Sequence, residues 1–224
     1  MCAVKKQRSK TRLSNKSVHF LMNSFEKDAY QEGYQLIAGI DEAGRGPLAG
    51  PVVAAAVVFP PDYFNNQIRD SKKLKPTERE ALFDVIQREA IAVGVSIADV
   101  EIIDRINILN ATLQAMREAV LELQSLPDFL LIDGNHKVPL MTPQKTIIKG
   151  DALSVSIAAA SIIAKVTRDR IMDMYHRQYP QYNFHRNKGY GTKEHIAAIQ
   201  RFGYCKIHRR SFHLKKLKQA KFEF

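Results

Sequence analysis

Apolar and polar positions along the 224 residues predict strands first, and then strands that alternate with helices. The apolar runs 36–41 and 52–59 are expected to form two strands, and the second is apolar throughout, which is typical of a strand covered on both faces. Further strands are predicted at 91–98, 129–132 and 145–149. This order favours an α/β domain with a mixed central sheet flanked by helices.

Apolar residues at helical spacing predict the helices. A short surface helix is expected within 20–34, and residues 77–80 (TERE) have the pattern of a capping box that opens the next helix. One continuous helix is predicted after residue 98, ending at Pro127. A long helix with small inward residues is expected to start at Gly150-Asp151, and Thr192 is a suitable N-cap for a last helix through residue 202.

The bend between the first two strands carries the most unusual chemistry. Asp41 and Glu42 stand side by side at the end of the first strand, and three glycines, two prolines and one arginine follow within nine residues. Adjacent acids before a glycine-rich bend serve no turn type, and bare backbone allows a ligand to approach closely. We therefore interpret this stretch as a binding or catalytic site.

Two further acids complete a candidate metal-binding set. Asp133 ends an apolar strand, and Asp151 precedes a helix. Hard divalent cations take oxygen ligands, and two such cations would orient water, hold a phosphodiester and stabilise its leaving oxygen. The alternative is a plain turn at Asp133-Gly134 and a plain N-cap at Asp151. Metal-dependent phosphodiester hydrolysis is the reaction class that this set indicates.

The net charge of +11 is carried by the two ends of the chain. Residues 1–17 hold six Lys and Arg and no acid, and residues 201–224 hold eight Lys and Arg and one acid, whereas 18–200 hold 20 basic and 22 acidic residues. Basic ends on a globular body indicate a polyanion partner, nucleic acid first. Solubilising tails, or an organellar targeting segment at 1–17, remain alternatives.

Other classes of protein find little support. Two cysteines form no disulfide framework, which favours a reducing compartment, and no apolar run is long enough to cross a bilayer. The amino terminus lacks the apolar region of a secretory signal. His208, His213 and Cys205 do not have the spacing of a standard zinc site, and neither a P-loop nor a nucleophile elbow is present. A cytoplasmic protein without a membrane partner is expected.

Seven stretches, in order, resemble the type 2 ribonucleases H, ribonuclease HII in particular. They cover about residues 36–212 and are GIDEAGRGPLAGP (39–51), DSKKL (70–74), IDG (132–134), KGD (149–151), AAASIIAKVTRD (158–169), KGYGT (188–192) and HRRSF (208–212). The resemblance implies an RNase H-like fold with a C-terminal helical segment. It divides the chain into a basic, partly disordered extension (1–34) and a catalytic domain with a basic helical end (35–224).

The same resemblance implies an endonuclease that cuts RNA in RNA–DNA hybrids. It also implies incision on the 5′ side of single ribonucleotides in duplex DNA, leaving 3′-hydroxyl and 5′-phosphate ends, by a monomer with Mg²⁺ or Mn²⁺. The implied metal ligands and catalytic residues are Asp41, Glu42, Asp133 and Asp151. Asp169 is a competing fourth acid, although its position within a helix favours a salt-bridged surface residue. Ribonuclease HIII is disfavoured by Arg45, where that enzyme typically has lysine, and by the short leading segment.

The resemblance also gives the remaining motifs roles in substrate binding. Gly44, Arg45 and Gly46 would contact the ribonucleotide, with Arg45 adding a charged phosphate contact. Tyr190 would stack on the next sugar and disfavour a second 2′-hydroxyl; its alternative is a packing aromatic. Ser71 and Lys72 are candidate phosphate contacts, with a solvated loop as the alternative.

Three residues of the long helix stay open: Lys165, Arg168 and Arg170 either flank the groove or are solvated. Two other functions compete with the ribonuclease. A non-catalytic nucleic-acid-binding module is disfavoured because clustered carboxylates without metal only repel each other. A generic metal-dependent nuclease would also cut all-DNA duplex.

Overall fold

The predicted strands meet in one mixed sheet. In the computed structural model, which describes residues 22–69 and 71–212, the sheet has five strands in the order β3-β2-β1-β4-β5. Their bounds are β1 (Ile37–Ala43), β2 (Val52–Val58), β3 (Ala92–Ala98), β4 (Phe129–Asp133) and β5 (Gln144–Ile147). β1 pairs antiparallel with β2 and parallel with β4; β2 is antiparallel to β3, and β4 is parallel to β5. The predicted mixed sheet is confirmed.

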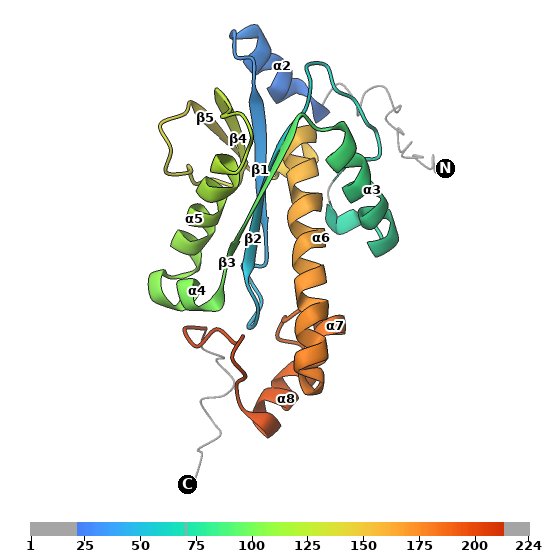
Figure 1. Cartoon of the computed structure of the whole chain (residues 1–224), viewed down its shortest axis with the longest axis vertical. Helices are drawn as coiled ribbons and strands as arrows, with labels where there is room; N and C mark the ends of the chain where they lie inside the picture. The colour runs from blue at the N-terminus through green and yellow to red at the C-terminus, as the bar shows by residue number, and fades with distance from the viewer. Residues whose placement is uncertain (1–21, 70, 213–224) are drawn as a thin grey trace, which may run out of the picture.

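Helices cover both faces of this sheet (Figure 1). α4 (Val100–Ile106) and α5 (Ile108–Leu121) pack on one face, and α3 (Pro76–Glu89) and α6 (Val155–Gln178) pack on the other. Every residue of β2 is buried, which explains its continuous apolar run. β1 and α6 touch at Gly39, where an added Cβ would lie 2.1 Å from the carbonyl carbon of Ser156.

Two predicted helix starts are wrong by a few residues. α3 begins at Pro76, and the carboxylate of Glu78 accepts a hydrogen bond from the backbone N–H of Lys75 at 2.6 Å, so its first turn lies ahead of the predicted 77–80 box. Residues Gly150–Ala152 form a short 3₁₀ turn, η2, and Ser154 caps α6 by accepting from the N–H of Ile157. Asp151 is therefore not the N-cap of the long helix.

The single helix predicted between residues 98 and 127 is two helices. The chain breaks at Asn107, whose φ of 67° lies outside the helical region. The Asn107 side chain accepts a hydrogen bond from the N–H of Asn110 and so caps α5. Asparagine tolerates this left-handed backbone and offers a capping oxygen, which the apolar periodicity could not reveal.

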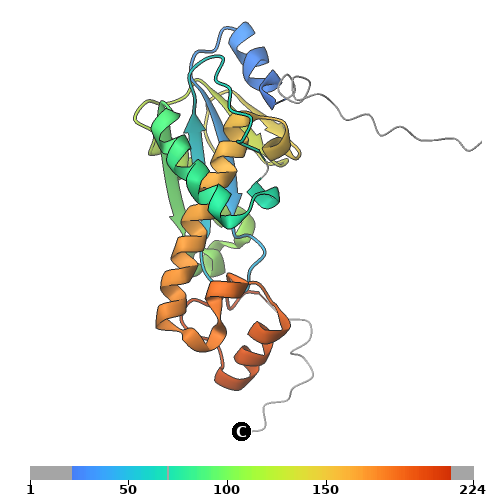
Figure 2. The same cartoon turned by 90° about the vertical axis from the view of Figure 1, so that its right-hand side faces the viewer.

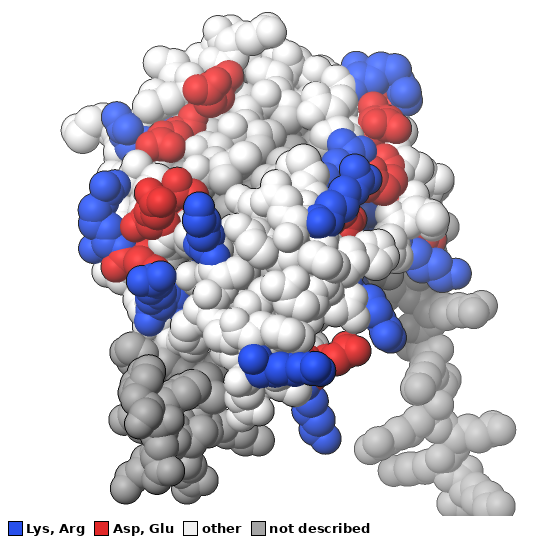
Figure 3. Space-filling model, turned by 60° about the horizontal axis from the view of Figure 1, so that its bottom comes forward, with Lys and Arg blue, Asp and Glu red and all other residues white. Residues whose placement is uncertain are grey.

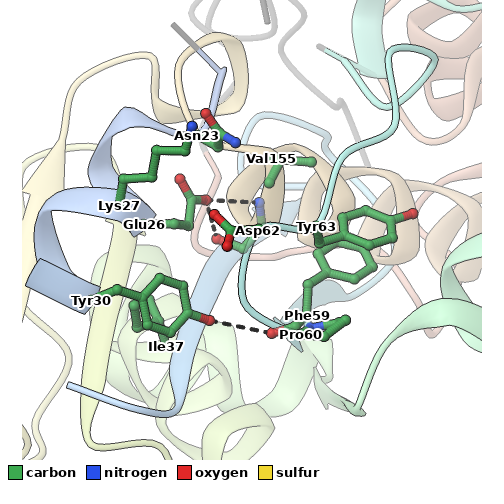
Figure 4. A pocket seen from close by; sticks show the side chains of 11 residues that line it. Asn23, Glu26, Lys27, Tyr30, Ile37, Phe59, Pro60, Asp62, Tyr63 and Val155 are labelled. Carbon is green, nitrogen blue, oxygen red and sulfur yellow. Dashed lines mark hydrogen bonds between the residues drawn. The ribbon is translucent and has the colours of Figure 1, made fainter. Parts of the chain in front are cut away.

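The first described helix, α2 (Ser24–Gln31), is fastened to the start of α6. Buried Glu26 accepts hydrogen bonds from the Ser154 hydroxyl at 2.5 Å, and from the hydroxyl and N–H of Ser156 at 2.6 and 3.1 Å. Figure 4 shows Glu26, with dashed lines for hydrogen bonds that it accepts, in a pocket that the stacked rings of Phe59 and Tyr63 also line. α2 is thus part of the packed unit, although the sequence placed it in the extension 1–34.

Beyond the sheet, α6 continues into a smaller second core (Figure 2). η3 (Pro180–Tyr182), α7 (Phe184–Asn187) and α8 (Lys193–Phe202) pack at its far end. The buried apolar residues there are Ala49, Met172, Tyr182, Phe184, Ile199 and Ile207. The predicted N-cap is confirmed, because Thr192 accepts from the N–H of His195. The expected helical end stops at α8: residues 203–212 form turns, and the rest lies outside the described residues.

Two buried arginines hold the glycine loop, residues 44–51, at the junction of the two cores. The guanidinium of Arg209 donates to the backbone carbonyl oxygens of residues 44, 45, 47, 50 and 51 at 2.6–3.2 Å. Arg168 donates to those of Ala49 and Pro51 in the same loop, and to Lys188. Gly44 has φ +102°, and an added Cβ would lie 2.1 Å from Arg168 Nε. The loop conformation thus depends on both arginines.

Replacing Arg209 with methionine is expected to unfold or loosen the glycine loop. Its backbone carbonyls would lose their shared donor inside a buried site, so the free energy of unfolding should fall by at least about 3 kcal/mol. Chemical denaturation measures this loss. The control is Arg210→Met, because the Arg210 side chain is exposed. Equal stability of the two variants would show that the hydrogen bonds of Arg209 do not hold the loop.

Candidate active site

The sheet brings Asp41 and Asp133 to adjoining strand ends. In the parallel pair of β1 and β4, Ile40 lies opposite Ile132, so the next residue of each strand is an aspartate. Ile40 and Ile132 fill the core under α4 and α5. Because side chains alternate along a strand, the two aspartates point to the opposite face, toward α6. The sheet therefore places two acids that are distant in sequence side by side.

The other two acids adjoin this pair. Glu42 is the next residue of β1, and its backbone N–H donates to Asp41 Oδ1 at 2.7 Å. Asp151 lies in η2, which is tied to β4 because the N–H of Gly150 donates to Asp133 Oδ1 at 2.7 Å. All four predicted acids therefore gather at one edge of the sheet.

Their charges act on each other. Burial raises the pKa of Asp41 well above its ordinary value, and the charges of Glu42 and Asp133 raise it further. Burial also raises the pKa of Glu42, where Arg45 opposes the shift and Asp133 adds to it. The pKa of Asp133 is raised by burial and by Asp151, against the hydrogen bond from Gly150. Burial is the largest cause of each shift, and a neighbouring carboxylate adds to all three.

Two basic side chains reach this acidic edge. Lys72 Nζ lies 3.1 Å from Asp151 Oδ2, and Arg45 Nη1 lies 3.4 Å from Glu42 Oε1. Both basic side chains are largely exposed, at 77% and 47%, whereas the carboxylates are mostly buried. Because the Lys72 and Arg45 side chains are flexible and exposed beside the acids, they can also contact an incoming phosphate.

The donor chemistry of the acids fits a hard divalent cation, because it consists of carboxylate oxygens alone. As the side chains stand, no three Asp, Glu, His or Cys residues in the described part of the chain converge closely enough to share one metal ion. Asp41, Glu42, Asp133 and Asp151 would hold such a cation through their carboxylate oxygens.

Ser71 lies behind the acids, so its predicted role changes. Its side chain is buried, and its hydroxyl lies 2.9 Å from that of Ser161 in α6. The Ser161 side chain in turn lowers the pKa of Asp41, against the larger effect of burial. Ser71 therefore supports an acid through Ser161, and its hydroxyl is not placed for a direct phosphate contact. Asp70 lies outside the described residues.

The competing acid Asp169 is salt-bridged, as its place in a helix indicates. It pairs with Lys165 at 2.7 Å and with Arg79 at 4.0 Å, and its side chain is partly buried rather than fully on the surface. Arg170 pairs with Glu80. Arg168 is neither solvated nor beside a groove, because it is buried among the loop carbonyls.

Tyr190 faces the glycine loop. Its loop, residues 187–192, joins the glycine loop through the N–H of Leu48, which donates to the carbonyl oxygen of Gly189 at 2.8 Å. A Cβ added at Gly46 would lie 3.6 Å from the Tyr190 ring, and 46% of Tyr190 is exposed. An exposed aromatic ring beside bare backbone is a platform for a sugar or a base.

Sequence reasoning missed the residues that hold these loops together. The HRRSF and AAASIIAKVTRD stretches contain Arg209 and Arg168, yet neither was expected to be buried. His208 was considered with Cys205 and His213 as a weak zinc set; it contacts Cys205 and His195, and His213 lies outside the described residues. No local signal marked the two arginines, because Arg168 stands between Thr167 and Asp169, and Arg209 between His208 and Arg210.

On the face shown in Figure 3, positive charge is not concentrated in one patch. At the end that carries α7 and α8, the described Lys and Arg side chains are spread over the surface with Asp and Glu side chains between them (Figure 3). Residues 1–17 and 213–224, outside the described part, hold ten of the 34 Lys and Arg and one of the 23 Asp and Glu. The predicted nucleic-acid role of the ends therefore stays a prediction. No helix in the described residues is long and apolar enough to cross a membrane.

Comparison with known proteins places these features in a family. A sequence model described as Ribonuclease HII matches residues 38–215. Ribonuclease HII of Syntrophus aciditrophicus is 64% identical over 197 residues, 88% of this chain and 93% of the relative. That of Acetivibrio thermocellus is 61% identical over 188 residues, 84% of this chain and 73% of the relative.

Solved structures agree in fold. Ribonuclease H2 from Pyrococcus horikoshii superposes with a TM-score of 0.68 at 26% identity, over 80% of this chain and 94% of that one. Ribonuclease HII from Archaeoglobus fulgidus, in a complex with PCNA, gives 0.68 at 23% identity, over 84% and 98%. The predicted RNase H-like fold is confirmed. The chain belongs to the ribonuclease HII family, hydrolases that cut the RNA strand of RNA–DNA hybrids.

Proposed function

We propose that this enzyme also incises duplex DNA on the 5′ side of a single embedded ribonucleotide, by two-metal-ion hydrolysis that leaves 3′-hydroxyl and 5′-phosphate ends. The observation that carries the proposal is the placement of the acids beside the glycine loop. Arg45 belongs to that loop and pairs with Glu42 at 3.4 Å, and Tyr190 lies on the far side of Gly46. A ribose bound on the glycine loop would therefore have its neighbouring phosphate at the four acids.

Asp41, Glu42, Asp133 and Asp151 are the proposed ligands of Mg²⁺ or Mn²⁺. Bound divalent cations activate water and stabilise the leaving oxygen of a phosphodiester. Burial raises the pKa of Asp41, Glu42 and Asp133, neighbouring carboxylates add to the shift, and a divalent cation would offset both effects. A structural neighbour, the ribonuclease HIII of Bst, was solved in complex with Mn²⁺. The fold itself fixes the backbone positions of the four acids, because they belong to β1, β4 and η2.

The glycine loop is the proposed sensor of the ribose. Backbone groups of Gly44, Arg45 and Gly46 would hydrogen-bond the 2′-hydroxyl, and a deoxyribose would leave those groups unpaired. Tyr190 would stack on the next sugar, where a second 2′-hydroxyl fits poorly. This pairing of contacts recognises a junction between ribonucleotide and deoxyribonucleotide rather than a base sequence.

Lys72 and Arg45 are the proposed phosphate contacts. Each is paired with an acid of the site through a flexible, exposed side chain, so each can exchange that partner for a phosphate oxygen. Ser71 is proposed to act indirectly, by fixing Ser161 against Asp41. Arg79 supports this turn by donating to the carbonyl oxygens of Ser71 and Leu74 at 3.0 and 2.7 Å.

Further expectations from the sequence remain proposals. Residues 35–224 would form the catalytic unit together with α2, which packs on α6, and the basic extension would be the part of 1–34 that precedes α2. The enzyme would act as a monomer in the cytoplasm, on RNA–DNA hybrids and on DNA duplexes that contain ribonucleotides.

A cleavage assay with a singly ribo-substituted duplex tests the proposed function. We expect one cut on the 5′ side of the ribonucleotide with Mg²⁺ or Mn²⁺, and none with a chelator. The matched control is an all-DNA duplex of the same sequence. Cutting of the all-DNA control at a similar rate would indicate a generic nuclease, and binding without any cutting would indicate a non-catalytic module.

Asp133→Asn is expected to abolish cleavage and to leave metal-free stability equal or higher. Asparagine keeps an oxygen that can accept from Gly150, but it removes one of the repelling charges. In thermal melts, Mg²⁺ at one hundred times its Kd should stabilise the parent by about 2.7 kcal/mol and the variant by less. A marked metal-free loss of Tm would instead make Asp133 a structural residue.

Tyr190→Ala is expected to spare folding, because the ring is half exposed, and to weaken junction cutting. Loss of one stacking contact is about 1–3 kcal/mol, or roughly 5- to 150-fold in rate on the singly substituted duplex. Tyr190→Phe keeps the ring and serves as the control. An unchanged single-turnover rate of Tyr190→Ala on the singly substituted duplex would refute the stacking role.

A further inference from the structure

Two buried histidines lie under the Tyr190 loop. His195 is in the first turn of α8, and His208 follows that helix; both side chains are almost fully buried. Their Nε2 atoms are 3.1 Å apart. His195 Nδ1 lies 2.9 Å from the carbonyl oxygen of Tyr190, and His208 Nδ1 lies 2.9 Å from the backbone nitrogen of Cys205. These contacts form one continuous path from Cys205 to Tyr190.

The two ends of this path assign every proton along it. The N–H of Cys205 can only donate, so His208 Nδ1 accepts and the His208 proton is on Nε2. That proton is donated to His195 Nε2, which places the His195 proton on Nδ1. The carbonyl of Tyr190 can only accept, and it receives that proton's hydrogen bond. Both rings are neutral in this arrangement, and any added proton would break one of the bonds.

The surroundings of the pair agree with two neutral rings. The rings of Tyr182 and Phe184 pack against both histidines, with centroids 4.9–6.3 Å away. Burial lowers the pKa of His208 to about 4, and the neighbouring His195 contributes to that shift. Burial likewise lowers the pKa of His195. The path therefore persists unchanged at neutral pH.

The Tyr190 peptide has few hydrogen bonds of its own, although the neighbouring residues Gly189 and Lys188 are tied by the N–H of Leu48 and by Arg168. Glycines flank Tyr190 on both sides, and a glycine lacks the steric limits that a side chain imposes on the backbone. The Tyr190 N–H donates to the carbonyl of Asn187, and its carbonyl accepts from the N–H of Thr192, both at 2.8 Å and both within the Tyr190 loop. The Tyr190 carbonyl also accepts a hydrogen bond from His195, and this bond links it to the packed core.

We propose that His195, oriented by His208, is a positioning residue for Tyr190 and thereby sets the preference for ribonucleotide–deoxyribonucleotide junctions. The inference rests on the proposed stacking role of Tyr190. His195 contacts no substrate in this scheme. It fixes the peptide that carries Tyr190, so that the ring stays over the glycine loop.

A matched pair of variants separates the two bonds of His195. An asparagine amide can take the place of Nδ1 and keep the hydrogen bond to the Tyr190 carbonyl, whereas a glutamine amide reaches the place of Nε2 and keeps the contact with His208. The readout is the ratio of single-turnover cleavage on a singly ribo-substituted duplex to that on a continuous RNA–DNA hybrid. Partial unfolding lowers both rates equally and leaves this ratio unchanged.

We expect His195→Gln to lower the ratio about tenfold, which is the effect of losing one hydrogen bond. The ratio of His195→Asn should stay near that of the parent. When Tyr190 is already alanine, His195→Gln should change the ratio by less than about twofold, because its effect passes through that ring. Equal ratios for the Asn and Gln variants, or a full effect of Gln without Tyr190, would overturn the proposal.

Amide hydrogen exchange of residues 188–192 tests the positioning without any substrate. Exchange should be faster in His195→Gln than in His195→Asn and the parent; equal exchange in all three would overturn the positioning role. If the parent does not cut the singly substituted duplex, the proposed function fails, while faster exchange in the Gln variant still supports the link between His195 and the loop. The two failures are thus distinguishable.

Discussion

The hydrogen bonds from two buried guanidinium groups to the carbonyls of residues 44–51 are the constraint on which the site depends. A glycine-rich loop has many accessible conformations, and its exposed backbone groups would otherwise bind water or each other. Arg209 alone contacts five of these carbonyls, and Arg168 joins the same loop to Lys188. A segment with many accessible conformations thereby becomes a fixed surface beside the acids.

The four acids, unlike the glycine loop, are held together at a cost in free energy. They are held close by β1, β4 and η2, although burial and mutual repulsion raise the pKa of Asp41, Glu42 and Asp133. This arrangement reduces the stability of the protein by itself and favours a divalent cation. Lys72 and Arg45 offset part of the charge through exposed side chains that can be displaced. The rigid glycine loop thus lies next to a charged site whose basic partners can move.

The second core at the end of α6 connects these parts. It carries Tyr190 toward Gly46, and it buries His195 and His208 beneath the same loop. The loops from both sides of the molecule meet there through the N–H of Leu48 and the carbonyl of Gly189. The geometry of the site is consequently a property of the contact between two cores, and small changes far from the acids are expected to alter selectivity.

By its own pattern the sequence determined the five strands, most of the helices and the two aspartates that meet at the ends of β1 and β4, because apolar periodicity and acids at strand ends are local signals. The substrate roles of the glycine loop and Tyr190 follow from the family resemblance and are proposals. Only the tertiary structure decided that Ser71 and Arg168 are buried, that Asn107 splits a helix and that Ser154, not Asp151, caps α6. It alone also joined Arg209 to the glycine loop, 159 residues before it at Gly50, and paired His195 with His208. These outcomes depend on which distant backbone groups need a donor, and that need exists only once the chain has folded.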